Sequence, residues 1–341
     1  MARPNESAGI PSPIYHHGLK PGFASTRYRF GPLSYPMFVN SLGMRDRQVR
    51  EVSLSPPKGW KRLLIIGDSF TEGVGYAYEK TFVGLVAEEL NPRQIEVLNA
   101  GVGSYSPIVY WKKVKALLDQ GVRFESLVVF LDISDIEDEI NYYLDEQGSV
   151  RTRSMEVIGG GQHVRSKGLW ARGEHFVRRH LWLTTTLARL TRRWVTAKKS
   201  GTRHGNILNL PRARWTVDPR LRREFGEMGL KRAEQHLTQL RAVLDKHGIQ
   251  HMTLAVYPWP TQIYYGDLDS VQVKYWEKWC ATNRVRFVNF FPSFVPAPGG
   301  SNRSRDVLSD YFIPYDMHWN EAGHRLIARQ LLAEIDLDPL K

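Results

Sequence analysis

The sequence predicts an α/β protein with a mainly parallel sheet that helices cover on both faces. Short apolar runs alternate with amphipathic stretches from residue 61 onward, which is the pattern of repeated strand–helix units. One run, Leu-Val-Val-Phe-Leu at 127–131, is apolar on both of its faces, as in a central parallel strand. Such alternation implies three layers with the sheet in the middle.

The first half of this pattern contains three predicted strands. Residues 62–67 form a short apolar run that ends at a glycine, and residues 95–99 form a second run followed by two glycines. Between them, the stretch 81–90 repeats apolar residues on one helical face, and a proline suits the first turn of a helix over 107–120. The third strand is 127–131.

The second half begins with an amphipathic stretch and a loop. Over 174–199 apolar residues recur at spacings of 7, 4, 3 and 4 opposite an arginine-rich face, which predicts a helix. We expect a loop over 201–219. The remaining elements are predicted at 224–247 (helix), 251–257 (strand), 270–283 (helix), 285–291 (strand) and 320–335 (helix, with Asn320 as its N-cap).

The predicted organisation is an N-terminal arm and one domain with an insert. Residues 1–60 are rich in proline, glycine and tyrosine, so we expect an irregular arm that packs on the domain formed by 61–341. A basic, mostly helical insert lies at about 145–223. The chain carries a net charge of +12, yet 18 Lys/Arg and only three acidic residues lie between Arg151 and Arg223. This segment therefore carries +15 and the remainder −3.

The basic helix over 174–199 allows several partners. It can pack on the domain with solvated arginines. It can also lie on an anionic membrane, with Trp182 and Trp194 at the interface, or bind an acidic polysaccharide. Nucleic acid is not expected as a partner, because no recognition motif accompanies the charge.

The sequence gives few signals for the cellular compartment. The polar N-terminus lacks the apolar core of a secretory signal, and no window reaches the ~18 apolar residues of a membrane span. The lone cysteine, Cys280, excludes an intrachain disulfide and a cysteine-based metal cluster. We therefore expect a cytoplasmic protein, with a membrane-peripheral location as the alternative.

Polar motifs follow the predicted strands, where the carboxyl ends of an open sheet gather functional groups. They are Asp68-Ser69 after the first strand, residues 101–105 after the second and the acidic stretch 132–139 after the third, with Asp316-Met317-His318 just before the last helix. We expect these four segments to converge on one edge of the sheet.

This set of residues suits nucleophilic catalysis. Ser69 needs a base to remove its proton, His318 can be that base, and Asp316 can orient the imidazole. The Ser69 N–H and a second N–H from the 101–104 turn can form an oxyanion hole, in which each donor is typically worth ~10²–10³ in rate. This chemistry needs no cofactor.

Other polar and aromatic residues allow two interpretations each. Asp132, Asp135, Glu137 and Asp138 could bind a hard metal ion, but a solvated rim or a helix N-terminus is the better expectation, and we predict no metal. His324 is expected on the buried side of the final helix. Three tryptophans could stack on sugars but are more often core residues: Trp259, Trp276 and Trp279.

The motifs resemble those of the GDSL/SGNH hydrolase family. Gly67-Asp68-Ser69-Phe70-Thr71-Glu72-Gly73 is similar to the family's first block, and Asp316-Met317-His318-Trp319-Asn320 is similar to its last. The segment Asn40–Asp46 resembles an arm found in bacterial relatives. The resemblance covers about 15–145 and 250–335, and it implies a flavodoxin-like three-layer fold with five strands and activity on ester bonds.

The resemblance also implies an oxyanion hole made by three residues. Ser104 holds the place of the family's second-block glycine, with Gly103 just ahead, and its backbone N–H remains a donor. Ser134 holds the place of the third-block asparagine and offers a shorter hydroxyl donor. The expected donors are therefore the N–H groups of Ser69 and Ser104 and the Ser134 hydroxyl.

We thus predict a serine-dependent ester hydrolase or O-acyltransferase that acts through an acyl-Ser69 intermediate. The Asp-x-His-Trp form resembles bacterial members associated with polysaccharide O-acetylation, which favours a small ester or acetylated carbohydrate as substrate. One alternative is a catalytically silent module that binds a polysaccharide or lipid, favoured by the missing asparagine. The other is a protein that docks on a membrane or polyanion through its insert.

Overall fold

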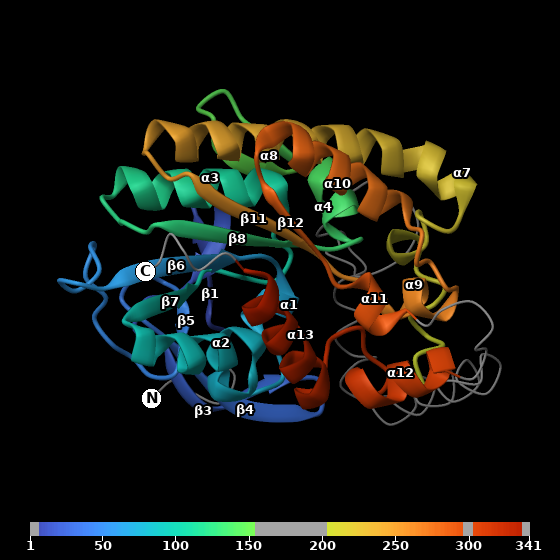
Figure 1. The fold of residues 1–341 in the computed structure, drawn as a ribbon, viewed down its shortest axis with the longest axis horizontal. Coiled ribbons are helices and arrows are strands. Elements are labelled where there is room, and N and C mark those ends of the chain that lie inside the picture. The colour runs from blue at the N-terminus through green and yellow to red at the C-terminus, as the bar shows by residue number, and fades with distance from the viewer. Residues whose placement is uncertain (1–6, 154–202, 296–302, 336–341) are drawn as a thin grey trace, which may run out of the picture.

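The computed structural model describes residues 7–153, 203–295 and 303–335. Its central feature is an eight-stranded sheet with helices on both faces, which confirms the predicted three-layer α/β/α fold (Figure 1). The helix predicted over 174–199, with Trp182 and Trp194, lies outside the described residues, as does most of the insert. Within the described residues, no helix has the length and apolar character that crossing a membrane requires.

Five parallel strands form the core of the sheet, and all five were predicted. They are β6 (Lys61–Ile66), β7 (Ile95–Asn99), β8 (Ser126–Leu131), β11 (His251–Val256) and β12 (Arg286–Asn289). Their order across the sheet is β7-β6-β8-β11-β12, the flavodoxin-like arrangement. The register places Leu63 between Val97 and Ser126. Because the chain reverses its direction of winding at β6, the crevice between β6 and β8 is the place where such folds bind ligands.

Five long helices cover this sheet. One face of the sheet is covered by α3 (Pro107–Asp119), α8 (Glu227–Lys246) and α10 (Val271–Asn283) (Figure 1). The other face is covered by α2 (Phe82–Leu90) and α13 (Glu321–Glu334). Asn320 caps α13 as predicted, because its side chain accepts from the N–H groups of Ala322 and Gly323. Thr81 and Ser270 cap α2 and α10 in the same way.

The N-terminal arm folds into strands. The prediction of an irregular arm is therefore wrong. It contains β1 (Gly9–Ser12), β2 (His16–Leu19), β3 (Ala24–Phe30), β4 (Leu33–Val39) and β5 (Arg45–Asp46). The last three extend the sheet with antiparallel strands in the order β5-β4-β3. The prediction missed them because β3 is only partly buried and contains a register irregularity between Ser25 and Tyr28, which breaks the alternation expected of a strand.

One buried arginine fastens this arm to the domain. Arg45 is 1% exposed, and its guanidinium donates to the carbonyls of Glu72, Gly73 and Tyr76. These carbonyls lie at and just after the end of α1 (Ser69–Glu72), where helical partners are missing. The arm therefore helps to fix the position of α1.

Shorter elements complete the structure. They are η1 (Tyr78–Lys80), η2 (Asn91–Arg93), α4 (Asp135–Asn141), β9 (Tyr142–Leu144), β10 (Val150–Thr152), η3 (Pro211–Ala213), α7 (Pro219–Leu221), η4 (Arg222–Gly226), α9 (Pro260–Tyr264), α11 (Phe291–Phe294) and α12 (Arg303–Tyr311). The segment predicted as a loop over 201–219 therefore contains η3 and the start of α7 within its described part. This segment packs on the domain through buried Ile207, Leu208 and Trp215.

Candidate active site

The structure brings Ser69, His318 and Asp316 into one chain of hydrogen bonds. His318 Nε2 lies 2.8 Å from Ser69 Oγ, and His318 Nδ1 lies 2.5 Å from Asp316 Oδ1. A carboxylate on Nδ1 keeps the proton there and leaves Nε2 free to accept from the serine hydroxyl. Burial alone would raise the pKa of Asp316, but its bond to His318 and the nearby imidazole outweigh burial and hold this pKa below its ordinary value.

Ser69 stands at the first position of α1, directly after β6. Asp68 caps this helix, because its Oδ1 accepts from the N–H of Phe70 at 2.9 Å. Gly67 permits the tight turn, since a Cβ there would come within 2.2 Å of Thr71 Oγ1. Within the described residues, the N–H of Ser69 has no acceptor, as is normal for the first residues of a helix.

The loop after β7 lies against Ser69. Gly101 approaches α1 so closely that a Cβ would lie 2.6 Å from Thr71 Cβ, and a Cβ on Gly103 would lie 3.6 Å from Ser69 Cβ. Ser104 has a φ of 62°, the left-handed conformation that favours glycine. Its N–H has no acceptor among the described residues. Ser104 thus fits the place that the resemblance gave it, while the N–H of Gly103 is occupied by Glu72 Oε2 at 2.8 Å.

The Ser134 hydroxyl is occupied by a bond within the protein. Ser134 is 3% exposed, and its hydroxyl donates to Asp132 Oδ1 at 2.8 Å. A hydroxyl has one proton to donate, so this side chain cannot serve an oxyanion while the bond to Asp132 persists. The structure therefore gives Ser134 a different partner from the one predicted.

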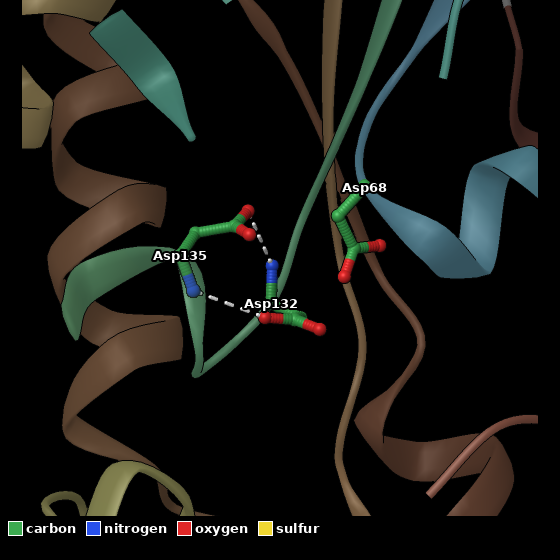
Figure 2. Close-up of side chains that lie close together, drawn as sticks. All are labelled: Asp68, Asp132 and Asp135. Atoms are coloured by element: carbon green, nitrogen blue, oxygen red, sulfur yellow. Dashed lines mark hydrogen bonds between the residues drawn. The ribbon is translucent and has the colours of Figure 1, made fainter. Parts of the chain in front are cut away.

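The Ser134 hydroxyl belongs to a buried acidic cluster that consists of Asp68, Asp132 and Asp135. Figure 2 shows Asp132 and Asp135 bonded to each other's backbone N–H groups, with Asp68 opposite them on the segment that follows β6. All three are buried, and their carboxylate oxygens lie within 4.8 Å of one another. The prediction that these acids form a solvated rim is wrong for Asp132 and Asp135, although Asp135 does begin helix α4.

Asp132 accepts several of the hydrogen bonds that the protein donates to this cluster. Its Oδ1 accepts from two backbone N–H groups and the Ser134 hydroxyl. Its Oδ2 accepts from the Trp259 indole at 2.6 Å. The Tyr257 hydroxyl lies between two carboxylates, 3.1 Å from Asp68 Oδ1 and 3.4 Å from Asp132 Oδ2. No local sequence pattern indicates the polar roles of these two aromatic residues.

The other two carboxyls of the cluster have raised pKa values. Burial and then the neighbouring Asp132 raise the pKa of Asp68 well above its ordinary value, against smaller effects of the bonds from Phe70, Tyr257 and Ser69. Burial, Asp132 and Asp68 likewise raise the pKa of Asp135. Protonation of both groups would leave less negative charge near Ser69 than three ionised carboxylates would.

The remaining predicted residues occupy other places. Glu137 and Asp138 form ion pairs with Arg212, at 3.4 and 2.8 Å. His324 is buried as predicted, where its Nδ1 accepts from the N–H of Phe82. The three tryptophans expected in the core are buried: Trp259, Trp276 and Trp279.

Two residues near the site were missed. Glu72 lies one helical turn after Ser69 and is 8% exposed. Residues three apart on a helix are neighbours, so the spacing between Ser69 and Glu72 could have indicated from the sequence that Glu72 lies near the site. Phe30 comes from the end of β3, and its ring contacts the His318 ring edge-on at a centroid distance of 5.1 Å. Nothing local in the sequence links residue 30 to residue 318.

Comparison with known proteins gave structural likenesses only. No family model matches the chain, and no curated protein sequence matches it either. Among solved structures, the esterase EstA from Pseudoalteromonas sp. has 12% identity and a TM-score of 0.42, covering 80% of this chain and 96% of EstA. A member of the lipolytic protein G-D-S-L family from Veillonella parvula has 12% identity and a TM-score of 0.41, with 80% and 97% covered.

A third likeness is to Axe2, an acetylxylan esterase from Geobacillus stearothermophilus. It has 14% identity and a TM-score of 0.37, with 82% of this chain and 96% of Axe2 covered. All three identities lie below 15%.

Proposed function

We propose that this protein is a serine-dependent ester hydrolase. The observation that carries the proposal is the hydrogen-bonded chain Ser69–His318–Asp316, with Ser69 Oγ 2.8 Å from His318 Nε2. This is the geometry expected of a nucleophile, a general base and a group that orients the base. Its place at the carboxyl end of β6, beside the crevice between β6 and β8, is where this topology binds ligands.

The proposed reaction forms and breaks an acyl-enzyme. Ser69 Oγ attacks the ester carbonyl while His318 Nε2 takes its proton, and the N–H groups of Ser69 and Ser104 donate to the developing oxyanion. His318 then gives the proton to the leaving alcohol, which leaves an acyl group on Ser69. Water, activated by the same imidazole, attacks this ester and releases the acid. A sugar hydroxyl in the place of water would make the reaction an acyl transfer.

The proposed substrate carries a small acyl group. The Asp316-Met317-His318-Trp319 motif resembles that of bacterial proteins associated with polysaccharide O-acetylation, which favours acetyl on a carbohydrate. Two aromatic rings contact the imidazole, those of Phe30 and Phe70, at centroid distances of 5.1 and 4.7 Å.

The test is labelling by a fluorophosphonate probe together with hydrolysis of p-nitrophenyl esters of graded chain length. We expect the wild type to label and to prefer the acetyl ester. Ser69→Ala should abolish labelling and lower kcat by ~10⁴-fold or more. The matched control is Ser55→Ala, which changes an exposed serine outside the site. A wild type that neither labels nor cleaves these esters would contradict the proposal.

A second candidate is a catalytically silent module with the same fold. The observation in its favour is that the Ser134 hydroxyl donates to Asp132, so the oxyanion hole has two donors instead of three. Such a module would bind an acylated polysaccharide or a lipid without cleaving it. Labelling of wild type but not of Ser69→Ala decides for the hydrolase.

A further inference from the structure

The described part of the insert contacts the loop that carries Asp316 and His318. His204 and Asn206 lie at the start of this part, and their side chains reach the backbone just before Asp316. The insert lies outside the resemblance to known hydrolases. Its contacts with the candidate site are therefore a property of this chain.

The loop in question contains a turn with an unfavourable residue. The N–H of Asp316 donates to the carbonyl of Ile313 at 3.0 Å, which closes a four-residue turn. Its second residue is Pro314, and its third is Tyr315, with a φ of 67°. This is the pattern of a type II turn, in which proline suits the second position and glycine the third. A tyrosine there is strained.

The His204 and Asn206 side chains each form a hydrogen bond with one peptide carbonyl of this turn. His204 is 1% exposed, and its Nε2 lies 3.0 Å from the carbonyl oxygen of Ile313. Because a carbonyl only accepts, Nε2 carries the ring proton. Burial lowers the pKa of His204, against smaller raising effects of this carbonyl and of Asp316. The neutral imidazole is therefore favoured.

Asn206 forms a hydrogen bond with the other peptide carbonyl, that of Tyr315. Its Nδ2 donates to the carbonyl of Tyr315 at 3.1 Å. That carbonyl belongs to the peptide that joins Tyr315 to Asp316, so its direction sets where the Asp316 side chain begins. The two bonds thus fix the turn at its first and third residues.

We infer that His204 and Asn206 are positioning residues, which hold the strained turn 313–316 so that Asp316 meets His318. This inference rests on the proposed function for its catalytic meaning. A displacement of the orienting carboxylate by a fraction of an ångström would misalign the base. The chemical step would suffer and ground-state binding would not, because neither residue is placed to touch the substrate.

The experiment compares Asn206→Ala with Asn209→Ala, which removes an exposed amide from the same segment. We expect Asn206→Ala to lower kcat for p-nitrophenyl acetate ~10-fold with KM changed less than ~2-fold. Asn209→Ala should change neither. Equal effects of the two variants would overturn the inference.

Repeating the Asn206→Ala measurement in a protein that also carries Tyr315→Gly tests the strain directly. Glycine adopts a positive φ without strain, so the turn in Tyr315→Gly should need less support. The loss caused by Asn206→Ala should therefore shrink from ~10-fold to ~2-fold or less when it is measured in the Tyr315→Gly background. A loss of the same size in both backgrounds would show that Asn206 does not act through the turn.

His204 offers a conservative replacement. His204→Gln keeps an N–H donor near the same place, whereas His204→Leu removes it. We expect Gln to retain most of kcat and Leu to lose ~10-fold, both measured on folded protein. Equal losses for the two variants would contradict a role for the hydrogen bond.

An NMR measurement that needs no catalytic turnover distinguishes this inference from the proposed function. In ¹⁵N-labelled protein, the His318 Nδ1 proton bonded to Asp316 should give a strongly downfield signal. Asn206→Ala should shift or remove it, Asn209→Ala should not, and adding Tyr315→Gly to Asn206→Ala should restore it. If wild type lacks esterase activity, the proposed function fails and this signal still decides the inference. An identical signal in all four proteins would overturn it.

Discussion

At the scale of single residues, one hydrogen bond decides what Ser134 can do. Its place in the sequence suggested a donor for the oxyanion, but its hydroxyl proton points at Asp132 Oδ1, 2.8 Å away. Asp132 keeps three other donors without that hydroxyl: the N–H groups of Ser134 and Asp135 and the Trp259 indole. We therefore expect that neither the cluster nor the proposed reaction needs the Ser134 hydroxyl.

Replacing Ser134 tests this assignment. Ser134→Ala should lower kcat/KM by less than ~3-fold, whereas the loss of a true oxyanion donor costs ~10²–10³. The measurement is steady-state hydrolysis of p-nitrophenyl acetate, with Ser69→Ala as the inactive reference. A loss of 100-fold or more in Ser134→Ala would return Ser134 to the oxyanion hole.

Asp135 makes stability depend on pH in an unusual direction. Burial and two neighbouring carboxyls raise its pKa, so the folded state keeps a proton that the unfolded state releases. The contribution of Asp135 to the free energy of unfolding is therefore present at low pH and falls as the pH rises above the ordinary carboxyl value. Asp135→Asn mimics the protonated side chain and should reduce this fall.

Urea denaturation between pH 4 and pH 8 measures the effect. We expect the free energy of unfolding to decline less over this range in Asp135→Asn than in wild type, by ~1.4 kcal/mol for each unit by which the pKa is raised. Asp119→Asn, which changes an exposed carboxyl, is the control. A decline as steep in Asp135→Asn as in wild type would show that this carboxyl is ionised throughout.

At the scale of elements, the loop after β7 is held by a buried network. Lys113 of α3 donates to the Ala100 carbonyl at 2.9 Å and to the Tyr105 hydroxyl at 3.1 Å. The Tyr105 hydroxyl donates in turn to the carbonyl of His17, and His17 Nε2 lies 2.8 Å from the carbonyl of Gly103. The arm and α3 thus hold both ends of the loop that presents the Ser104 N–H.

Lys113 gives this network a pH dependence. Burial lowers the pKa of Lys113 to about 7, against a smaller raising effect of Glu72. From about pH 7 to pH 10 the unfolded chain holds a proton on this amine that the folded protein has released. The contribution of Lys113 to the free energy of unfolding therefore rises with pH over this window.

Lys113→Met should remove that rise. The free energy of unfolding, measured by urea denaturation at pH 7 and pH 9.5, should increase less in this variant than in wild type. Lys115→Met, which changes a partly exposed lysine of the same helix, is the control. The assignment fails if the variant and wild type show the same increase.

At the scale of the whole molecule, the arm and the parallel sheet form one continuous structure. The antiparallel strands β3–β5 join β7 through the pair Arg45 and Asn99, and Arg45 binds three carbonyls around the end of α1. Asn99 donates to the Thr71 carbonyl of the same helix at 2.8 Å. Both partners of this strand pair thus converge on the helix that presents Ser69.

Arg45→Met should therefore destabilise the protein strongly. It leaves three carbonyls without their donor, and each unsatisfied buried group costs about 1–3 kcal/mol. We expect the free energy of unfolding to fall by about 3 kcal/mol or more and the rate of fluorophosphonate labelling of Ser69 to fall with it. Arg27→Met, at an exposed position of β3, is the control. Equal stability of the two variants would mean that these bonds contribute little.

The sequence predicted the parallel core and the meeting of Ser69, His318 and Asp316, but little of their surroundings. Apolar runs such as 127–131 are typical of buried strands. The motifs around Ser69 and His318 are compatible with few structural arrangements. Burial of Asp132 and Asp135 was missed, because carboxylates are rarely buried unless paired. The Tyr257 and Trp259 side chains that contact Asp132 come from more than 100 positions away in the chain. Contacts of that kind leave no local pattern.

The distance along the chain between Ser69 and His318 has a consequence for synthesis. Their hydrogen bond joins residues 249 positions apart, and His318 lies just before the final helix, α13. A ribosome exposes Ser69 long before it has translated His318. In the proposed mechanism a nascent chain therefore carries an inert hydroxyl, and ester chemistry can begin only after His318 has been synthesised and α13 has docked beside α2.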